Sequence, residues 1–338
     1  MAKVLVTGGA GYIGSHTAVD LLQHGHQVVT VDNHSNAYEA AVDHINKITG
    51  QDVSHYKIDL RDAEATYRIF EEHADITAII HFAALKAVGE STEQPLAYFD
   101  NNMKSLINVL NGGQQAGVRN FIFSSSCTVY GQATDLPVTE ETEMKEAESP
   151  YGRTKQLGEY MLKDIAQFTD MRVISLRYFN PAGAHQSGLL GESSKKIALN
   201  LVPVITETAA GKRHECVIFG DDYDTRDGSC VRDYIHVEDL AHAHTCAVNY
   251  LDNEKNQEPY EVFNLGIGDG VTVLEAIKAF EEVSGEKLNY RIGPRRPGDV
   301  IAIYSNYKRA KKYLGWEPKY DIADIMRTAW YWENHRPF

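Results

Sequence analysis

The sequence predicts an α/β fold, in which a doubly wound parallel sheet is joined to a smaller mixed α/β region. Three observations support this class. Short apolar runs alternate with helical patterns through the first half of the chain. The runs are rich in Val, Ile and Phe with little polar alternation, as in strands buried on both faces. A glycine-rich turn links the first run to the first helical pattern.

Six strands are expected in this first half, each a short run of β-branched and aromatic residues. They cover residues 3–8, 27–32, 54–59, 76–83, 119–126 and 172–179. Because helical segments separate them, right-handed crossovers must join consecutive strands, and this makes the sheet parallel.

Helices are expected between these strands and again near the end of the chain. The first runs from about Tyr12 to His24, with an apolar face that includes Ile13 and Leu21 and with Gly25 as its stop. Further helices are expected from about Asp62, Pro95 and Tyr151 onward, and at 237–251, 272–284, 306–314 and 322–335.

The organisation changes after about Asn180, where long Gly- and Asp-rich loops replace the regular alternation. Loops 181–192 and 219–234 are longer than ordinary connectors, and long ordered loops in compact domains commonly carry function. We therefore expect a larger domain at 1–180 and a substrate-binding region at 181–338. The strand-like run at 260–266 could return to the main sheet.

The overall charge limits the class of partner. The 338-residue chain has a net charge of -14. Nucleic acids and anionic membrane surfaces both attract clustered Lys and Arg, so neither is expected as the main partner. No basic, apolar leader opens the chain, and no run of about 18 apolar residues occurs in it. These features predict a cytoplasmic protein.

Neither cysteine nor histidine spacing predicts a metal site. The four cysteines are scattered without a C-x-x-C pair, as is usual in a reducing compartment. The 14 histidines show no H-E-x-x-H pattern or similar ligand spacing. We therefore expect no metal, and we interpret the histidines as surface and core residues.

The glycine turn predicts a dinucleotide site. Gly8, Gly11 and Gly14 stand between the first strand and the first helix, where glycine lets the backbone approach a pyrophosphate. Asp32 ends the second strand, and there a carboxylate can accept hydrogen bonds from the adenosine ribose. Residues 33–46 contain no Arg or Lys to pair with a 2′-phosphate, so NAD is expected rather than NADP. Residues 1–180 are thus predicted to form an NAD-binding Rossmann domain.

A second acid, Asp59, ends the third expected strand. It could meet the adenine of the dinucleotide, or it could cap the helix that begins near Asp62. Short acidic residues at strand ends do both, so the sequence leaves the two roles open.

Tyr151 and Lys155 are candidates for proton chemistry. They lie one turn apart on an expected helix and therefore share a face. An ammonium close to the phenol would favour the phenolate and lower the pKa of Tyr151. A base beside a nicotinamide is what hydride removal from an alcohol requires, because the hydroxyl proton must leave as well.

A third candidate comes from the run "FIFSSSCTVYG". The strand ends in a group of hydroxyl residues, at the edge where open α/β sheets bind ligands. Ser126 or Thr128 could hold the reacting oxygen beside Tyr151, whereas Ser124 and Ser125 are expected to satisfy backbone groups. Cys127 has no histidine nearby in the sequence and is expected to be a packing residue.

Six motifs together resemble the extended short-chain dehydrogenase/reductases, and within them the epimerases of UDP-sugars. They are TGGAGYIG, HFAALKAVGES, SSSCTVYG, SPYGRTKQ, RYFNPAGAH and VRDYIHVEDLA, in this order along the chain. The resemblance implies reversible C4 epimerisation of UDP-glucose and UDP-galactose through a 4-keto sugar, with a hydride passed to and from tightly held NAD. It assigns Tyr151 as acid and base, with Lys155 and Ser126 assisting, and it implies a role in galactose metabolism.

The same resemblance implies the residues of both binding sites. The cofactor residues are Gly8, Gly11, Tyr12, Ile13, Gly14, Asp32, Asn33, Asn36, Asp59, Leu60, Phe82, Ala83, Lys86, Asn101, Ser126, Tyr151, Lys155 and Tyr178. The substrate residues are Lys86, Ser126, Tyr151, Phe179, Asn180, Asn200, Leu201, Arg232, Tyr234, Arg296 and Asp299. Lys86 also follows a strand end, where a cation could meet a phosphate of NAD; the alternative is a solvated lysine.

The two arginines have a physical argument of their own. Arg232 and Arg296 lie in loops of an acidic protein, and guanidinium groups suit a diphosphate. The alternative is an ion pair with Asp233 or Asp299.

Where some bacterial members of the family carry a tyrosine near the sugar's C2 group, this chain has Ile303, a smaller but stiff side chain.

Three other functions can be compared with epimerisation. A 4,6-dehydratase needs an acid and a base, and that family carries Asp-Glu after the threonine, where this chain has Val129 and Tyr130. A free dehydrogenase would share the motifs but exchange NADH with solvent. An NAD-sensing protein would commonly lack the Tyr–Lys pair.

The resemblance also implies a homodimer through helices at 95–115 and 151–168, although packing on the sheet explains their apolar residues equally well.

Overall fold

The main sheet has seven parallel strands in a computed structural model that describes all residues except 194, 196, 297–298 and 338. The strand order is β11-β6-β5-β4-β1-β2-β3. The strands are β1 (Lys3–Thr7), β2 (Gln27–Asp32), β3 (Ser54–Lys57), β4 (Ala78–His81), β5 (Asn120–Ser126), β6 (Arg172–Tyr178) and β11 (Tyr260–Leu265). The predicted doubly wound sheet is confirmed, and its six expected strands are present, the third ending two residues early and the fourth shorter by two residues at each end.

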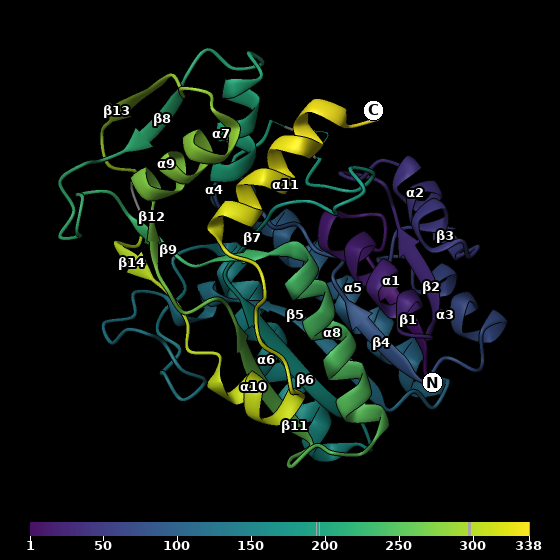
Figure 1. Ribbon diagram of the computed structural model, residues 1–338. Helices are drawn as coiled ribbons and strands as arrows, with labels where there is room; N and C mark the ends of the chain where they lie inside the picture. The colour runs from purple at the N-terminus through teal and green to yellow at the C-terminus, as the bar shows by residue number, and fades with distance from the viewer. Residues whose placement is uncertain (194, 196, 297–298, 338) are drawn as a thin grey trace.

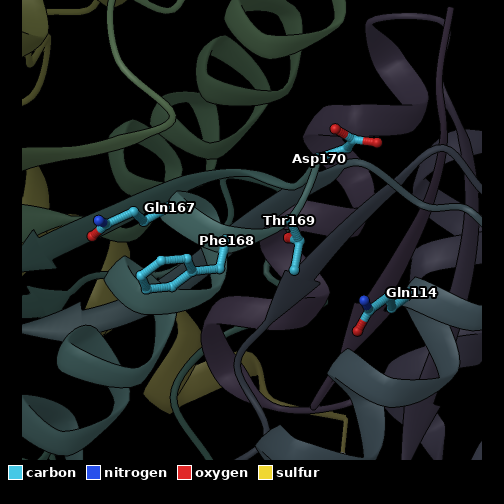
Figure 2. Close-up of a pocket in the computed structure, with 5 residues that line it drawn as sticks. All are labelled: Gln114, Gln167, Phe168, Thr169 and Asp170. Atoms are coloured by element: carbon cyan, nitrogen blue, oxygen red, sulfur yellow. The ribbon is translucent and has the colours of Figure 1, made fainter.

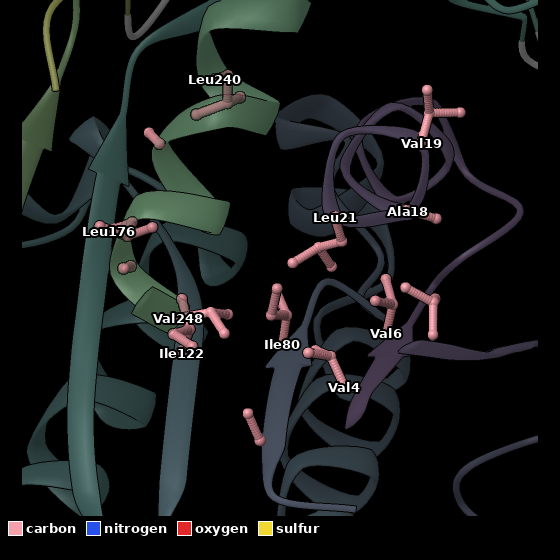
Figure 3. Close-up of a cluster of buried hydrophobic side chains, with 14 of the residues drawn as sticks. Val4, Val6, Ala18, Val19, Leu21, Ile80, Ile122, Leu176, Leu240 and Val248 are labelled. Atoms are coloured by element: carbon pink, nitrogen blue, oxygen red, sulfur yellow. The ribbon is translucent and has the colours of Figure 1, made fainter. Parts of the chain in front are cut away.

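Helices cover both faces of this sheet (Figure 1). One face is covered by α1 (Tyr12–Gln23), α2 (Ala40–Thr49), α8 (Val237–Asp252) and α10 (Lys308–Leu314). The other is covered by α3 (Ala63–Glu72), α5 (Pro95–Gln115) and α6 (Pro150–Phe168). Successive strand side chains point to opposite faces, so Val4 and Val6 belong to the first core and Leu5 to the second. Figure 3 shows the first core, where Leu21 of α1 and Leu240 of α8 meet the sheet.

Helix α2 has no counterpart among the predicted elements. Its buried apolar face consists only of Ala41, Val42 and Ile45, which is too little periodic signal to distinguish a short helix from a loop. The helix ends at Thr49 and is capped by Gly50, whose φ of 68° is left-handed and suits glycine.

The second region is a mixed layer built around its own apolar core. It contains α7 (Leu201–Ala209), α9 (Val273–Ser284) and α11 (Ile322–His335). Its strands are β7 (Asn180–Ala182) with β10 (Tyr234–His236), β8 (Cys216–Phe219) with β13 (Tyr290–Gly293), and β9 (Val231–Arg232) between β12 (Val271–Thr272) and β14 (Ala302–Ile303). Strands of two to four residues show no periodicity, so the sequence pattern does not reveal them.

The chain crosses between the two regions more than once. Residues 260–266 return to the main sheet as β11, which pairs in parallel with β6. Helix α8, also beyond residue 180, packs beside α1 on the same sheet face (Figure 1). The division of the chain at residue 180 therefore stays a prediction.

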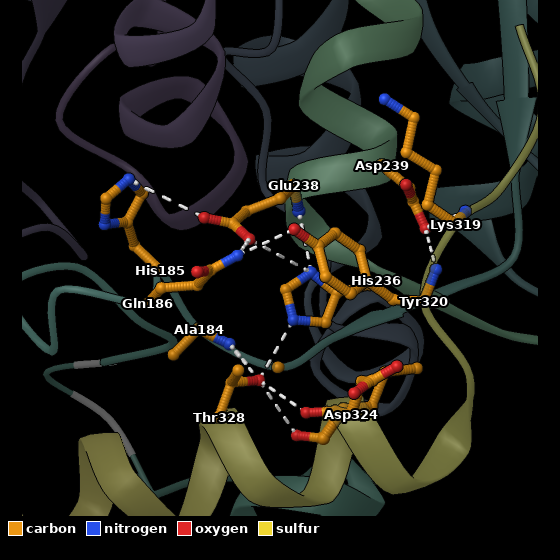
Figure 4. Close-up of polar contacts among 12 residues, drawn as sticks. Ala184, His185, Gln186, His236, Glu238, Asp239, Lys319, Tyr320, Asp324 and Thr328 are labelled. Carbon is orange, nitrogen blue, oxygen red and sulfur yellow. Dashed lines mark hydrogen bonds and ion pairs between the residues drawn. The ribbon is translucent and has the colours of Figure 1, made fainter.

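A polar cluster holds loop 181–192 against α8 and α11 (Figure 4). The Ala184 N–H donates to Thr328 Oγ1 on α11 at 3.2 Å, and Gln186 Nε2 donates to Glu238 Oε2 on α8 at 3.4 Å. Gln186 Nε2 also donates to the hydroxyl of Tyr320, in the segment just before α11, at 2.7 Å. These contacts fix the loop that leaves the carboxyl end of β6, and so they help to shape the edge where a ligand would lie.

The helices of the described residues include none that combines the length and apolar character needed to span a bilayer.

Candidate active site

The glycine turn leaves the first turn of α1 open to an anion. Gly11 is the N-cap of α1 and offers no side-chain cap to the helix amides. Gly8 has a left-handed φ of 68° and donates its backbone N–H to Val31 O at 2.7 Å. A Cβ on Gly14 would stand 2.2 Å from Gly8 O, so only glycine lets the turn lie this close to the helix. Tyr12 and Ile13 complete this first turn. Open amides at a helix N-terminus fit a pyrophosphate.

The carboxyl ends of β2 and β3 form the next part of the same edge. Asp32 ends β2 and accepts a hydrogen bond from the His34 N–H at 2.8 Å. Arg61 pairs with Asp59 at 2.8 Å and holds the pKa of that carboxyl below its usual value. Asp62, not Asp59, caps α3 by accepting from the Ala65 N–H. The capping alternative for Asp59 is therefore wrong.

Three more predicted cofactor residues lie around these two strand ends. Asn33 and Asn36 are exposed in the loop that follows β2. Leu60 is buried, and its carbonyl accepts from Asn108 Nδ2 at 2.8 Å.

Thr7 ties the end of β4 to the glycine turn. Its hydroxyl accepts a hydrogen bond from the Ala83 N–H at 3.2 Å, and its carbonyl accepts from the Phe82 N–H at 3.2 Å. The Phe82 ring lies 4.7 Å from that of His244 on α8. The predicted residues Phe82 and Ala83 are thereby brought beside Gly8, where a Cβ would stand 3.0 Å from Ala83 N.

Asn102 is a positioning residue that sequence reasoning missed. It accepts from the Leu85 N–H at 2.8 Å and donates to Leu85 O at 3.0 Å. It also donates to Thr154 Oγ1 on α6 at 3.1 Å, and it accepts from the predicted cofactor residue Asn101 at 3.0 Å. It therefore locks the loop after β4 to the helix that carries Tyr151. The sequence pointed to this position only through the adjacent Asn101, which the family resemblance implied as a cofactor residue.

Tyr151, Lys155 and Ser126 meet where β5 ends and α6 begins. Ser149 caps α6 by accepting from the Gly152 N–H at 3.1 Å. Lys155 is 4% exposed, its Nζ donates to Ser124 O at 2.6 Å, and it lies 5.8 Å from the centre of the Tyr151 ring. Ser126 is the last residue of β5. The structure thus brings together the three residues that the sequence proposed for catalysis.

The pKa of Tyr151 is raised, not lowered as we expected from the sequence. Burial raises the pKa of Tyr151 to about 12, and a hydrogen bond with Ser126 acts in the opposite direction. Burial also lowers the pKa of Lys155 to about 7, which the nearby Glu159 carboxylate partly opposes. The expectation assumed a fully charged ammonium, whereas desolvation in this site penalises the charged form of both groups.

The remaining side chains of the β5 edge have distinct positions. Ser124 hydrogen-bonds to the hydroxyl of Tyr178, the last residue of β6. Thr128 Oγ1 is buried without a hydrogen-bond partner among the described residues, so it stays an alternative to Ser126 as a substrate contact. Cys127 packs against an apolar cluster, and burial raises the pKa of its thiol to about 12, as in a packing residue.

A buried ion pair behind this edge was also missed. Arg177 on β6 and Glu159 on α6 are 2.6 Å apart, with side chains 5% and 2% exposed. Tyr260 donates to Glu159 at 3.3 Å, and Ser125 hydrogen-bonds to it as well. Arg177 also donates to the Tyr130 hydroxyl at 3.0 Å. These bonds fasten α6, and with it Tyr151 and Lys155, to β5 and β6.

The two predicted substrate arginines converge on one carboxylate. Arg232 Nη2 lies 3.2 Å and Arg296 Nη2 lies 2.9 Å from Asp299 Oδ1. The Arg296 guanidinium also lies 5.3 Å from the centre of the Phe219 ring. Asp233 is not a partner of either arginine in the described residues, because it is buried and accepts from Ser305 instead. The alternative of an ion pair with Asp299 is therefore present for both arginines. Because two cations share one anion, the cluster still keeps net positive charge for a phosphate.

Lys86 and Asn200 also meet at a single carboxylate. Glu192 Oε1 lies 3.3 Å from Lys86 Nζ and accepts from Asn200 Nδ2 at 2.6 Å. Lys86 is therefore ion-paired, and its side chain is also 53% exposed to solvent, so the solvated alternative stays open. Asn200 is the N-cap of α7, which begins at Leu201, without a side-chain bond to that helix.

The other substrate candidates lie along β7 and β10. Asn180 donates to Asp233 O both from its backbone N–H at 3.0 Å and from Nδ2 at 3.1 Å. Phe179 is 6% and Tyr234 is 5% exposed. Ile303, at the end of β14, is buried in the same cluster as Phe179. This packing places Ile303, the residue expected near the sugar's C2 group, beside the predicted substrate residue Phe179.

A hollow at the far end of α6 is not part of this site (Figure 2). It is lined by Gln114, Gln167, Phe168, Thr169 and Asp170. Tyr151 is in the first turn of α6, and Phe168 is its last residue. At 1.5 Å per residue these helix ends are about 25 Å apart.

Comparisons with known proteins extend over nearly the whole chain. A family model described as GDP-mannose 4,6 dehydratase matches residues 5–329. UDP-glucose 4-epimerase 2 of Arabidopsis thaliana is 45% identical over 100% of this chain and 97% of the relative. UDP-glucose 4-epimerase of Erwinia amylovora is 46% identical over 99% and 98%.

Solved structures give the same similarity. A UDP-glucose 4-epimerase from Stenotrophomonas maltophila, with bound NAD and formylated UDP-arabinopyranose, has a TM-score of 0.95 at 45% identity, over 99% of this chain and 98% of that one. The enzyme from Bifidobacterium longum, in complex with NAD⁺ and UDP, has a TM-score of 0.94 at 44% identity, over 99% of each chain.

Proposed function

The chain belongs to the UDP-glucose 4-epimerase family of the extended short-chain dehydrogenase/reductases, and on this premise we propose which of its residues perform the reaction. The reaction is the reversible C4 epimerisation of UDP-glucose and UDP-galactose. Bound NAD supplies a reversible hydride acceptor for C4 of the sugar. The observation that carries the assignment of roles is the meeting of Tyr151, Lys155 and Ser126 at the carboxyl edge of β5.

The proton is assigned to Tyr151. In its phenolate form it accepts the proton of the sugar's 4-hydroxyl as the C4–H bond breaks, and the resulting phenol returns a proton when the hydride comes back to the opposite face of the 4-keto sugar. Ser126, which hydrogen-bonds to Tyr151, holds the 4-oxygen of the sugar in place. Lys155, with a pKa near 7, can carry a proton at neutral pH and so supply positive charge beside the phenolate.

The chain's own residues fit NAD along one continuous edge. The uncapped first turn of α1, with Gly8, Gly11 and Gly14, is assigned to the pyrophosphate. Asp32 is assigned to the adenosine ribose, and Asn33 and Asp59 to the region of the adenine. Phe82 and Ala83, which follow β4, are assigned to the nicotinamide half, and Lys86 to a phosphate of NAD.

The UDP diphosphate is assigned to Arg232 and Arg296. Replacing either residue by Met should lower kcat/KM for UDP-galactose by about 10- to 100-fold, mainly through KM, because one charge-assisted hydrogen bond is lost. Arg295 provides a matched control, since it pairs with Asp222 at 2.7 Å instead of with Asp299. Equal losses in the Arg295→Met and Arg296→Met variants would remove Arg296 from the assignment.

The test of the function is a single incubation. Purified, desalted protein is mixed with UDP-galactose without added NAD, and the nucleotide sugars are separated by chromatography. UDP-glucose should form, because the hydride returns to the sugar and the cofactor stays bound. Net NADH would indicate a free dehydrogenase, and no reaction even with added NAD would contradict the substrate assignment.

Dehydration is disfavoured by the side chains around Thr128. Elimination of water needs an acid and a base beyond Tyr151. Val129 and Tyr130, which follow Thr128, are both fully buried, and Tyr130 donates its hydroxyl proton to Asn264 at 2.6 Å. A 4-keto-6-deoxy product in the incubation would overturn this argument.

A homodimer through α5 and α6 is part of the proposal. Leu106, Val109 and Leu110 are buried in the chain's own core, so they are not available to a partner. Ile107 on α5 and Tyr160 on α6 are 42% and 52% exposed, which leaves apolar surface on both helices. Sedimentation equilibrium should give the mass of two chains, and an Ile107→Lys variant should give that of one.

We also place the protein in the cytoplasm, because its four cysteines are free, as suits a reducing compartment. Fractionation of cells that produce the protein tests this location.

A further inference from the structure

Four side chains able to bind a metal meet between α1 and α8. Asp20 lies on α1, and His24 is the C-cap of that helix. His242 and Cys246 lie on α8. Each pair is four residues apart and therefore shares a helix face. The two helices pack side by side (Figure 1), and Figure 3 shows the parts of them that face the sheet.

Three of these residues have the spacing of a coordination site. Asp20 Oδ2 lies 3.3 Å from His24 Nδ1 and 3.3 Å from His242 Nδ1. The ligand atoms of all three lie within 4.8 Å of one another. Nitrogen and oxygen ligands about 2.0–2.2 Å from a tetrahedral Zn²⁺ are about 3.4 Å from each other. The two distances from Asp20 Oδ2 therefore already match those between ligands of a tetrahedral Zn²⁺, without movement of the backbone.

The surroundings of the cluster support ligation. Cys246 Sγ lies 3.5 Å from His242 Nε2, so a metal on Nδ1 leaves the other ring nitrogen donating to the thiol. The side chains of His24, Asp20 and His242 are 43%, 18% and 30% exposed, which leaves a route for a hydrated ion. His24 Nδ1 also contacts Asp20 O at 2.7 Å, a hydrogen bond that ligation would replace.

We propose that Asp20, His24 and His242 form a transition-metal site of the Zn²⁺ class that bridges α1 and α8, with water as the fourth ligand and Cys246 orienting His242. Two imidazoles and one carboxylate are a ligand set that Zn²⁺ favours. His24 lies about 20 Å along the helix from Gly11, so the ion takes no part in sugar chemistry. The site ties a helix from beyond residue 180 to the helix of the glycine turn, and it does not depend on the proposed function.

The test is a zinc titration of the full-length protein after treatment with a chelator. Isothermal calorimetry should show one Zn²⁺ per chain, and saturating Zn²⁺ should raise the Tm by a few degrees, because the ion binds only the folded state. His24→Gln and His242→Gln should each abolish this binding and the Tm increase. Their epimerase activity, measured without zinc, should equal that of the wild type and report intact folding.

Two further variants sharpen the result. His214→Gln, which removes an exposed histidine before β8, should bind Zn²⁺ like the wild type. Cys246→Ala should keep one site per chain but weaken the affinity by about 10- to 100-fold, as expected for a residue that orients a ligand. The proposal is overturned if the wild type shows no saturable binding, or if His24→Gln and His242→Gln bind as the wild type does. In that case the cluster is only an Asp–His ion-pair network.

Discussion

Replacing Tyr151 by Phe should lower kcat for UDP-galactose by about 10²- to 10⁴-fold, the usual contribution of one acid–base group. The fold and NAD affinity should be nearly unchanged, because the substitution removes only a hydroxyl that points toward Ser126. The measurement is the rate of UDP-glucose formation, with the NAD content of the purified protein determined separately.

Tyr160→Phe is a matched control for this experiment. Tyr160 lies on the same helix as Tyr151, but it is 52% exposed. Its variant should turn over like the wild type. Wild-type-like turnover in the Tyr151→Phe variant would refute the proton role that we assign to Tyr151.

Replacing Glu159 by Gln should lower the free energy of unfolding by about 3–5 kcal/mol, because it leaves the buried Arg177 cation without its anion. Glu159 is 2% exposed, so solvent cannot replace the lost charge. Thermal or urea unfolding of the purified variant measures the loss. Since Glu159 lies one turn after Lys155 on α6, activity should also fall at temperatures where the variant is still folded.

Glu146→Gln gives the corresponding exposed control. Glu146 pairs with Arg153 at 3.3 Å, but its side chain is 89% exposed. Exposed pairs contribute about 0–1 kcal/mol, so this variant should unfold almost like the wild type. If both glutamine variants lose the same small amount, the Arg177–Glu159 pair does not hold the catalytic helix in place.

Much of the main domain could be predicted because its signals are local. The strands of the parallel sheet are continuous apolar runs, and the glycines of the first turn stand next to the helix that they serve. The pairing of Tyr151 with Lys155 needs only the helical repeat. Helix α2 and the short strands beyond residue 180 could not be predicted, since their buried residues are too few to set a period.

By itself the sequence determined six strands of the seven-stranded sheet, the dinucleotide turn, the preference for NAD and the Tyr151–Lys155 pair, because each depends on residues within one or two turns or strands. Only the tertiary structure decided the partners of the charged groups. It joined Arg232 and Arg296 at Asp299, and Lys86 to Glu192.

The tertiary structure also decided the pKa values of Tyr151 and Lys155 and the meeting of Asp20 with His242. The physical reason is that burial and ion pairing depend on segments far apart in the chain. Desolvation by several elements at once reversed the pKa direction that a Tyr–Lys helical pair alone would predict.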